Sequence, residues 1–100
     1  MGELVMAAYL IADIQITNPM KFEEYRAQVE PTIAKFSGRY LVRGGSPERL
    51  EGNWDPTRIV VLEFPSLDLA KQWYNSGAYH GPKQIRQESS DSNVIFVNGI

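Results

Sequence analysis

The fold is decided by the stretch Tyr9-Leu10-Ile11-Ala12-Asp13-Ile14-Gln15-Ile16, a run rich in β-branched residues that predicts a strand. A second run of this kind covers residues 58–64 and ends at Pro65. Side chains alternate along a strand, so each run divides into an apolar set and a mixed set. The apolar sets must face helices. The sequence therefore indicates a sheet with one covered face and an opposite face that is half apolar and half ionisable.

The segment after the first strand predicts a helix. Asn18 is a good N-cap, Pro19 suits the first helical position, and apolar residues follow at spacings of three and four as far as about Ser37. Pro31 lies inside this pattern and predicts a kink or a restart of the helix. Gly38 is expected to supply a left-handed stop.

The other expected elements are a strand over residues 39–43, a helix from Ser66 through Tyr74 that breaks at Ser76-Gly77, a short turn from Pro82 to Ile85, and a last strand over residues 94–97. Gly44 to Thr57 spans 14 residues, too few for a crossover helix, so the flanking strands form an antiparallel hairpin with a long tip. This order predicts an α+β, ferredoxin-like βαββαβ fold with a four-stranded antiparallel sheet and both helices on one face. We place strands 9–16 and 58–64 in its centre, parallel to each other.

Length and composition bound the organisation and the partners. A chain of 100 residues has room for one domain, assigned to residues 8–100, with residues 1–7 as an N-terminal extension. With 10 basic and 12 acidic residues and no basic run, nucleic acid is not an expected partner. The absence of cysteine fits a reducing compartment, so cytoplasm is expected. The apolar stretch 4–16 contains Asp13 and is too short to span a bilayer, so no membrane association is expected.

The opposite face of the predicted sheet carries an apolar patch larger than monomers usually expose. Its members are Tyr9, Ile11, Leu41, Ile59 and Val61. A second copy packed sheet to sheet about a two-fold axis would cover the patch and give a barrel-like homodimer with an enclosed cavity. The sequence thus predicts a homodimer.

Charged residues on the same face are the catalytic candidates. Asp13 and Glu63 are expected near the ends of neighbouring strands, with Arg39 beside Glu63, so that the three cluster at one mouth of the cavity. A carboxylate beside an apolar wall can act as a general base or acid, and Arg39 can clamp an anionic oxygen. An equally weighted interpretation is a structural ion-pair network that sets register between subunits.

Five further residues are candidates for ligand binding: Tyr9, Arg43, Trp54, Tyr79 and His80. We place Arg43 on the opposite face, toward the other end from Arg39. Trp54 lies on the long hairpin tip and is expected to cap a cavity or to dock on the partner subunit. His80, the only histidine, is a surface turn residue or a titrating group near a pocket, and alone it does not make a metal site. We expect no metal and no cofactor.

Four motifs and a tyrosine carry a family resemblance: Gly38-Arg39-Tyr40-Leu41-Val42-Arg43-Gly44-Gly45, Glu51-Gly52-Asn53-Trp54, Leu62-Glu63-Phe64-Pro65-Ser66, Trp73-Tyr74-Asn75-Ser76 and Tyr79. From about Ala8 to Gly99 the chain resembles a bacterial family catalogued as domain of unknown function 1330. The resemblance implies a ferredoxin-like protomer of the dimeric α/β-barrel superfamily, whose other members include cofactor-independent monooxygenases, isomerases, dehydratases and stress-related binding proteins. It implies no established activity and assigns no catalytic residue.

The leading hypothesis is a dimeric small-molecule-binding protein, or an enzyme without metal or cofactor, that acts on a small polar or aromatic metabolite in the inter-sheet cavity. Asp13 or Glu63 would be the base and Arg39 the anion clamp. The alternative is a non-catalytic structural or regulatory dimer module. A haem-degrading enzyme of the same superfamily would need an axial histidine on a helix over the pocket, and His80 in its turn fits that role poorly.

Overall fold

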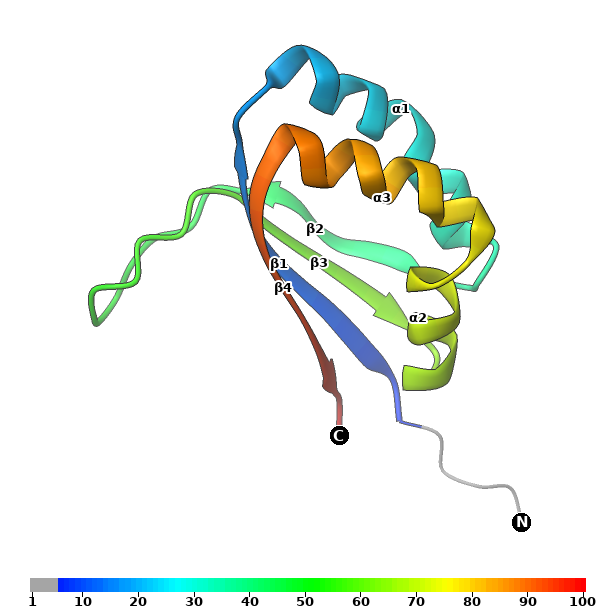
Figure 1. Cartoon of the computed structure of the whole chain (residues 1–100). Helices are drawn as coiled ribbons and strands as arrows, with labels where there is room; N and C mark the ends of the chain where they lie inside the picture. Colours follow the sequence, from blue (N-terminus) through cyan, green and yellow to red (C-terminus); the bar gives the residue numbers. More distant parts are fainter. Residues whose placement is uncertain (1–5) are drawn as a thin grey trace.

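The computed structural model describes residues 6–100 as a sheet covered by helices, with a long hairpin that extends to one side (Figure 1). The elements are β1 (Ala8–Ile16), α1 (Pro19–Ala34), β2 (Arg39–Gly45), β3 (Ile59–Phe64), α2 (Leu67–Tyr74), α3 (Gly77–Ser89) and β4 (Ser90–Asn98). We call residues 46–58, which join β2 to β3, the arm. The predicted N-terminal extension, residues 1–7, falls mostly outside the described residues. Within residues 6–100, every helix is too short or too polar to span a bilayer.

The four strands lie in the order β2-β3-β1-β4, and every neighbouring pair is antiparallel. The α+β, ferredoxin-like prediction is confirmed. The prediction that β1 and β3 run parallel was wrong. Helix α1 connects β1 to β2, and these two strands run parallel with one strand position between them. That position is occupied by β3, which forms an antiparallel hairpin with β2 and therefore also runs antiparallel to β1.

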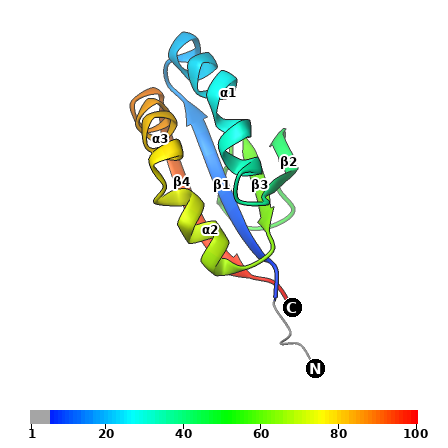
Figure 2. The same ribbon diagram turned by 90° about the vertical axis from the view of Figure 1, so that its right-hand side faces the viewer.

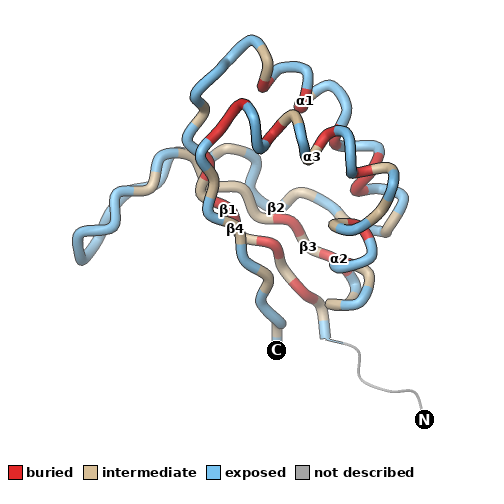
Figure 3. Tube along the Cα trace, in the orientation of Figure 1, coloured by how far each residue is buried: buried red, intermediate tan, exposed pale blue. Residues whose placement is uncertain are grey.

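All three helices cover one face of the sheet (Figure 2), and buried residues concentrate where helices and sheet meet (Figure 3). The core consists of Leu10, Ala12, Ile14, Phe22, Tyr25, Val29, Ile33, Leu62, Phe64, Ala70, Trp73 and Tyr79. The alternation predicted for β1 and β3 therefore assigns the covered face correctly.

The other face, which we call the open face, has no helix over it (Figure 1). The strand register aligns on it Tyr9, Ile11, Asp13, Val42, Ile59, Val61, Glu63, Asn93, Ile95 and Val97. Ile95 is 58% exposed and Val97 42% exposed. Four of the five residues expected in the apolar patch, Tyr9, Ile11, Ile59 and Val61, align on this face, and the patch extends onto β4. The fifth, Leu41, has no partner on β3 in the register.

A β-bulge changes the faces of β2. Tyr40 pairs with Leu62, but the register then shifts, so that Val42 pairs with Val61 and Arg43 with Val60. Leu41 is the extra residue of this bulge, and an extra residue reverses the side of every side chain that follows. The prediction that Arg43 lies on the open face was wrong, because the bulge turns it toward the helices.

Helix α1 begins as predicted, with the Asn18 side chain accepting from the Lys21 N–H at 3.1 Å. Pro31 does not interrupt the helix. Proline has no N–H, so the Ala27 carbonyl, four residues earlier, receives no helical hydrogen bond. Ala27 is exposed, and water can bind its carbonyl instead. The left-handed stop was placed one residue too late. Ser37 has φ of 63°, and the Gly38 N–H closes the helix end on the Ile33 carbonyl at 3.1 Å.

Helix α3 replaces the short turn expected at Pro82 to Ile85. The Ser76 side chain accepts from the Tyr79 N–H at 3.2 Å and starts a helix of 13 residues. Pro82 removes only its own donor and remains inside the helix. Tyr79 and His80 therefore lie in the first turn of α3 and not in a loop. Tyr79 is buried, whereas His80 is exposed.

Candidate functional site

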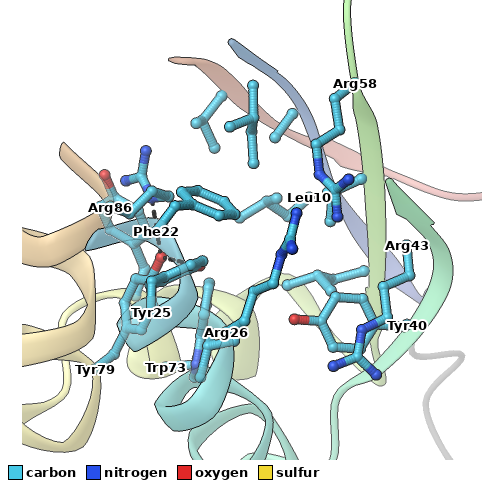
Figure 4. Close-up of a pocket in the computed structure, with 17 residues that line it drawn as sticks. Leu10, Phe22, Tyr25, Arg26, Tyr40, Arg43, Arg58, Trp73, Tyr79 and Arg86 are labelled. Carbon is cyan, nitrogen blue, oxygen red and sulfur yellow. Dashed lines mark hydrogen bonds between the residues drawn. The ribbon is translucent and has the colours of Figure 1, made fainter. Parts of the chain in front are cut away.

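A cavity lies between the helices and the covered face of the sheet (Figure 4). Its volume is about 50 Å³, which is room for a few water molecules, since one water needs about 10–15 Å³ by this measure. A small organic ligand would therefore enter only if the side chains around the mouth moved apart.

The apolar lining of the cavity differs between the sheet and the helices. The sheet supplies an apolar floor of Leu10, Ala12, Ile14, Val60, Leu62 and Val94, and the helices supply aromatic rings from Phe22, Tyr25, Trp73, Tyr74 and Tyr79. The Trp73 and Tyr79 rings are stacked with centroids 4.0 Å apart. This packing holds Tyr79 in one orientation, because a stacked ring cannot turn without losing its contacts.

Tyr25, Tyr79 and Arg86 form a buried polar chain at one side of the cavity (Figure 4). The Arg86 Nε donates to the Tyr79 hydroxyl at 3.2 Å, and the Tyr79 and Tyr25 hydroxyls are 3.0 Å apart. Because the Tyr79 oxygen accepts from Arg86, its own O–H can donate to the Tyr25 oxygen, and the Tyr25 O–H can then donate into the cavity. Burial raises the pKa of Tyr25 well above its usual value, so this hydroxyl stays protonated.

Arg26, Arg43 and Arg58 lie toward the opposite side of the cavity from Arg86 (Figure 4). Arg43 donates to the Glu30 carboxylate at 2.8 Å and lies over the Tyr40 ring, 4.6 Å from its centroid. Arg26 pairs with the Glu23 carboxylate and lies 5.2 Å from the Phe22 ring centroid. Because Arg43 is exposed and Arg26 half-buried, this side is the mouth.

The charges that line the cavity are all positive. Its lining contains Arg26, Arg43, Arg58 and Arg86 and no acidic side chain. Among residues 6–100, neither Arg58 nor Arg86 belongs to an ion pair. Arg86 is only 5% exposed. Two of the four lining arginines, Arg58 and Arg86, thus carry a positive charge that no carboxylate in the described part of the chain neutralises, inside a chain whose net charge is −2.

The sequence-predicted catalytic cluster does not form. Antiparallel pairing places Glu63 opposite Tyr9 and Asp13 opposite Ile59, which separates the two carboxylates along the sheet. Arg39 does pair with Glu63, with its Nε donating at 2.8 Å, but its side chain is 69% exposed. The interaction of Tyr9 with the Glu63 carboxylate raises the pKa of the Tyr9 hydroxyl. Tyr9, Arg39 and Glu63 form a surface cluster on the open face.

Asp13 anchors the arm instead of joining that cluster. Its Oδ1 accepts the Thr57 N–H at 3.0 Å, and its Oδ2 accepts the Trp54 Nε1–H at 3.3 Å. The backbone donor of Thr57 is the main cause that lowers the pKa of Asp13. Trp54 is 63% exposed and does not line the cavity.

Comparison with known proteins identifies the family. The model of the family described as domain of unknown function (DUF1330) matches residues 7–100. The chain belongs to this family. No curated protein gives a significant match.

The solved structures that resemble this DUF1330 member share its fold at low sequence identity. The protein of unknown function RPA0582 from Rhodopseudomonas palustris has a TM-score of 0.77 and 14% identity, with 97% of this chain and 85% of that chain covered. The cofactor-independent oxygenase SnoaB from Streptomyces nogalater has a TM-score of 0.57 and 14% identity, with 97% and 95% covered. A dimeric ferredoxin-like protein of unknown function from Thermobifida fusca has a TM-score of 0.60 and 12% identity, with 99% and 96% covered. These similarities establish the fold.

Two of the predicted site residues, Arg43 and Tyr79, line the cavity of this DUF1330 chain, and Tyr9, Asp13, Arg39, Trp54, Glu63 and His80 do not. Sequence reasoning missed Tyr25, Arg26, Arg58 and Arg86. Two signals were available: Tyr79 and Arg86 lie seven residues apart, on one helical face, and Tyr25 belongs to the apolar stripe of α1. A polar group on an apolar stripe indicates either a buried hydrogen bond or a ligand contact.

Proposed function

We propose that the chain is a small-molecule-binding protein whose ligand is a small organic anion held in the cavity between the helices and the sheet. The proposal rests on Arg86. A buried guanidinium without a carboxylate partner carries a large desolvation penalty, and an anionic ligand would offset that penalty. Arginine also matches a carboxylate with two parallel hydrogen bonds.

The rest of the cavity suits the apolar body of such a ligand. The floor is aliphatic, and the rings of Phe22, Tyr25 and Trp73 present aromatic faces and edges. A planar ring can pack against these groups while its anionic substituent reaches Arg86 and the Tyr25 hydroxyl. The proposed ligand class is therefore an aromatic carboxylate or phenolate.

We also propose that the protein is a homodimer through its open face. The exposed apolar residues there, Ile95 and Val97 among them, support this, as does the dimeric state of the similar Thermobifida fusca protein. The inter-sheet cavity predicted from the sequence requires the second copy and stays a prediction. The anion site proposed here lies within one protomer, on the other side of the sheet.

The proposal is tested by titrating small carboxylates and phenols, with benzoate as the reference probe. Trp73 lines the cavity, so its fluorescence reports binding in a Trp54→Phe background, and a thermal shift gives an independent readout. Arg86→Gln is expected to weaken benzoate binding by roughly thirtyfold or more, because a buried charged partner is lost. Far-UV circular dichroism shows whether this variant folds.

Arg39→Gln is the matched control, since it removes the same charge from the open face and should leave binding unchanged. If Arg86→Gln does not fold, Tyr79→Phe replaces it, because it keeps the stacked ring and removes the hydroxyl that holds Arg86. Loss of binding in Arg39→Gln with retention in the cavity variants would place the site on the open face and overturn the proposal. Absence of binding by every probe would favour the alternative, a non-catalytic structural or regulatory dimer module.

A second candidate is an oxygenase that uses no metal or cofactor, the activity by which SnoaB is described. The Arg86 and Tyr25 donors, with Tyr79 positioning them, favour it, because they would stabilise an enolate or phenolate oxygen, the form of an organic substrate that gives electrons to dioxygen. The test is oxygen consumption with polyphenols in wild type and Tyr79→Phe. If the wild type consumes no oxygen above the buffer rate, binding without oxygenation is the function.

A further inference from the structure

Arg58 is a second uncompensated charge in the cavity, and its backbone is tied to the neighbouring strand. Its carbonyl accepts the Ile14 N–H at 2.9 Å, which joins the start of β3 to β1. Its guanidinium carbon lies 2.2 Å from where a Cβ on residue 44 would be, so the guanidinium packs directly against the Gly44 backbone. Gly44 has φ of 74°, which favours glycine. A side chain at position 44 would displace the guanidinium from this place at the mouth.

The neighbours of Arg58 do not neutralise it. Arg26 and Arg43 each have a glutamate partner, whereas Arg58 belongs to no ion pair among residues 6–100. Its Nε is buried and has no hydrogen-bond partner within the same residues. Burial first, and then the charge of Arg26, lower the pKa of Arg58. Arginine nevertheless stays charged at neutral pH, so an unsatisfied cation faces the cavity.

The two uncompensated guanidiniums lie on different sides of the cavity. Figure 4 shows Arg86 on one side with Tyr79 and Tyr25, and Arg58 on the other, with Phe22 and Leu10 between them. A ligand with one anionic group can neutralise only one of these sites at a time. A ligand with an anionic group at each end and an apolar body between them can satisfy both.

We infer that the ligand of the cavity is a small dicarboxylate with an apolar body, one carboxylate binding Arg86 and the Tyr25 hydroxyl and the other binding Arg58 at the mouth. This inference rests on the proposed function, since it assigns the ligand class of the same cavity. The two ends have different surroundings. The inner carboxylate is enclosed by Tyr25 and Tyr79, whereas the outer one lies beside the half-buried Arg26 and Arg58.

The experiment compares benzoate with the three benzenedicarboxylates and with aliphatic dicarboxylates from succinate to adipate, at one fixed ionic strength. The readout is Trp73 fluorescence in the Trp54→Phe background, checked by calorimetry.

At least one dicarboxylate is expected to bind about tenfold or more tightly than benzoate. Arg58→Gln should remove that advantage and leave benzoate binding unchanged, whereas Arg86→Gln should weaken both. Arg49→Gln, which removes an exposed arginine of the arm, is the matched control and should change neither.

The outcomes separate the two levels of the proposal. If benzoate binds as tightly as every dicarboxylate, or if Arg58→Gln preserves the dicarboxylate advantage, the dicarboxylate inference is wrong and the anion site at Arg86 stands. If neither benzoate nor any dicarboxylate binds, both are wrong. Arg58→Lys keeps the charge but loses the planar fork, and it should retain only part of the advantage.

Discussion

Ser37 and Gly38 show how two adjacent residues end a helix by different means. Ser37 holds the left-handed conformation, which costs a residue with a side chain roughly 1–2 kcal/mol. Gly38 supplies space instead, because a Cβ there would be 2.5 Å from the Phe64 ring and 2.7 Å from Ile33. The glycine therefore allows the end of α1 to approach β3.

Substitutions at these two positions should change stability in opposite directions. Ser37→Gly is expected to raise the free energy of unfolding by about 0.5–1 kcal/mol. Glycine adopts positive φ without strain, and this gain exceeds the cost of the more flexible unfolded chain that glycine gives. Gly38→Ala should lower it by about 1–3 kcal/mol through overpacking against Phe64. Urea denaturation measures both. If Ser37→Gly destabilised the protein, the backbone account of this turn would be wrong.

The arm is anchored to β1 mainly by the Asp13 carboxylate. Asp13 reaches from β1 to accept hydrogen bonds from Thr57 and Trp54. These donors outweigh partial desolvation and hold the pKa of Asp13 below its unfolded value of about 3.9. A lowered pKa in the folded state means that the ionised form contributes stability above the unfolded value. That contribution is lost as pH falls through the lowered folded value.

Asp13→Asn should therefore be less stable than wild type at pH 7, and the difference should disappear as the pH is lowered below about 4. Melting temperatures measured across this range give the comparison. Asp55→Asn, on the same arm, is the control, since the Asp55 side chain is 91% exposed and should give little difference at any pH. A wild-type advantage that persisted unchanged in acid would show that Asp13 does not anchor the arm through its charge.

The elements also explain which features the sequence could predict. Alternation assigned Leu10 and Leu62 to the covered face because β1 and β3 pair without interruption. It failed at Arg43, because alternation cannot reveal the extra residue of a bulge. The prediction that β3 runs parallel to β1 was an error of topology. Parallel strands would have placed Asp13 and Glu63 at the same end of the sheet, and the predicted cluster depended on this error alone.

The candidate site was harder to predict than the fold. Tyr79 was a candidate, but Arg86 was not, since an arginine near a helix end is ordinarily exposed. Its burial depends on α1 and α3 lying side by side over the sheet (Figure 2), a tertiary contact that no local pattern encodes. The hydrogen bond to Tyr79 is likewise formed only in the folded chain.

At the scale of the whole molecule, the two faces of the sheet have different properties. The covered face and its helices enclose the basic cavity, and the open face presents apolar residues around the Arg39–Glu63 pair. Tyr9, Ile11, Ile59 and Val61 on this face are half-buried, and Ile95 and Val97 are exposed. A second copy on the open face would bury these residues without blocking the cavity mouth, which lies on the other side of the sheet.

The dimer is tested by placing a charge in the apolar row of the open face. Ile95 pairs with Ile11, which in turn pairs with Val61, so Ile95 belongs to an apolar row across three strands. Ile95→Glu should weaken dimerisation by about 2 kcal/mol or more, roughly thirtyfold, because the carboxylate would be buried without a partner. Light scattering after size exclusion, over a dilution series, measures the shift in the dimer dissociation constant.

Met20→Glu is the control, since Met20 is 85% exposed on α1 and lies away from the open face. If Ile95→Glu and Met20→Glu have the same mass as wild type at every concentration, the open face is not the dimer interface. If the Ile95→Glu monomer still binds benzoate through Arg86, the anion site is complete within one protomer.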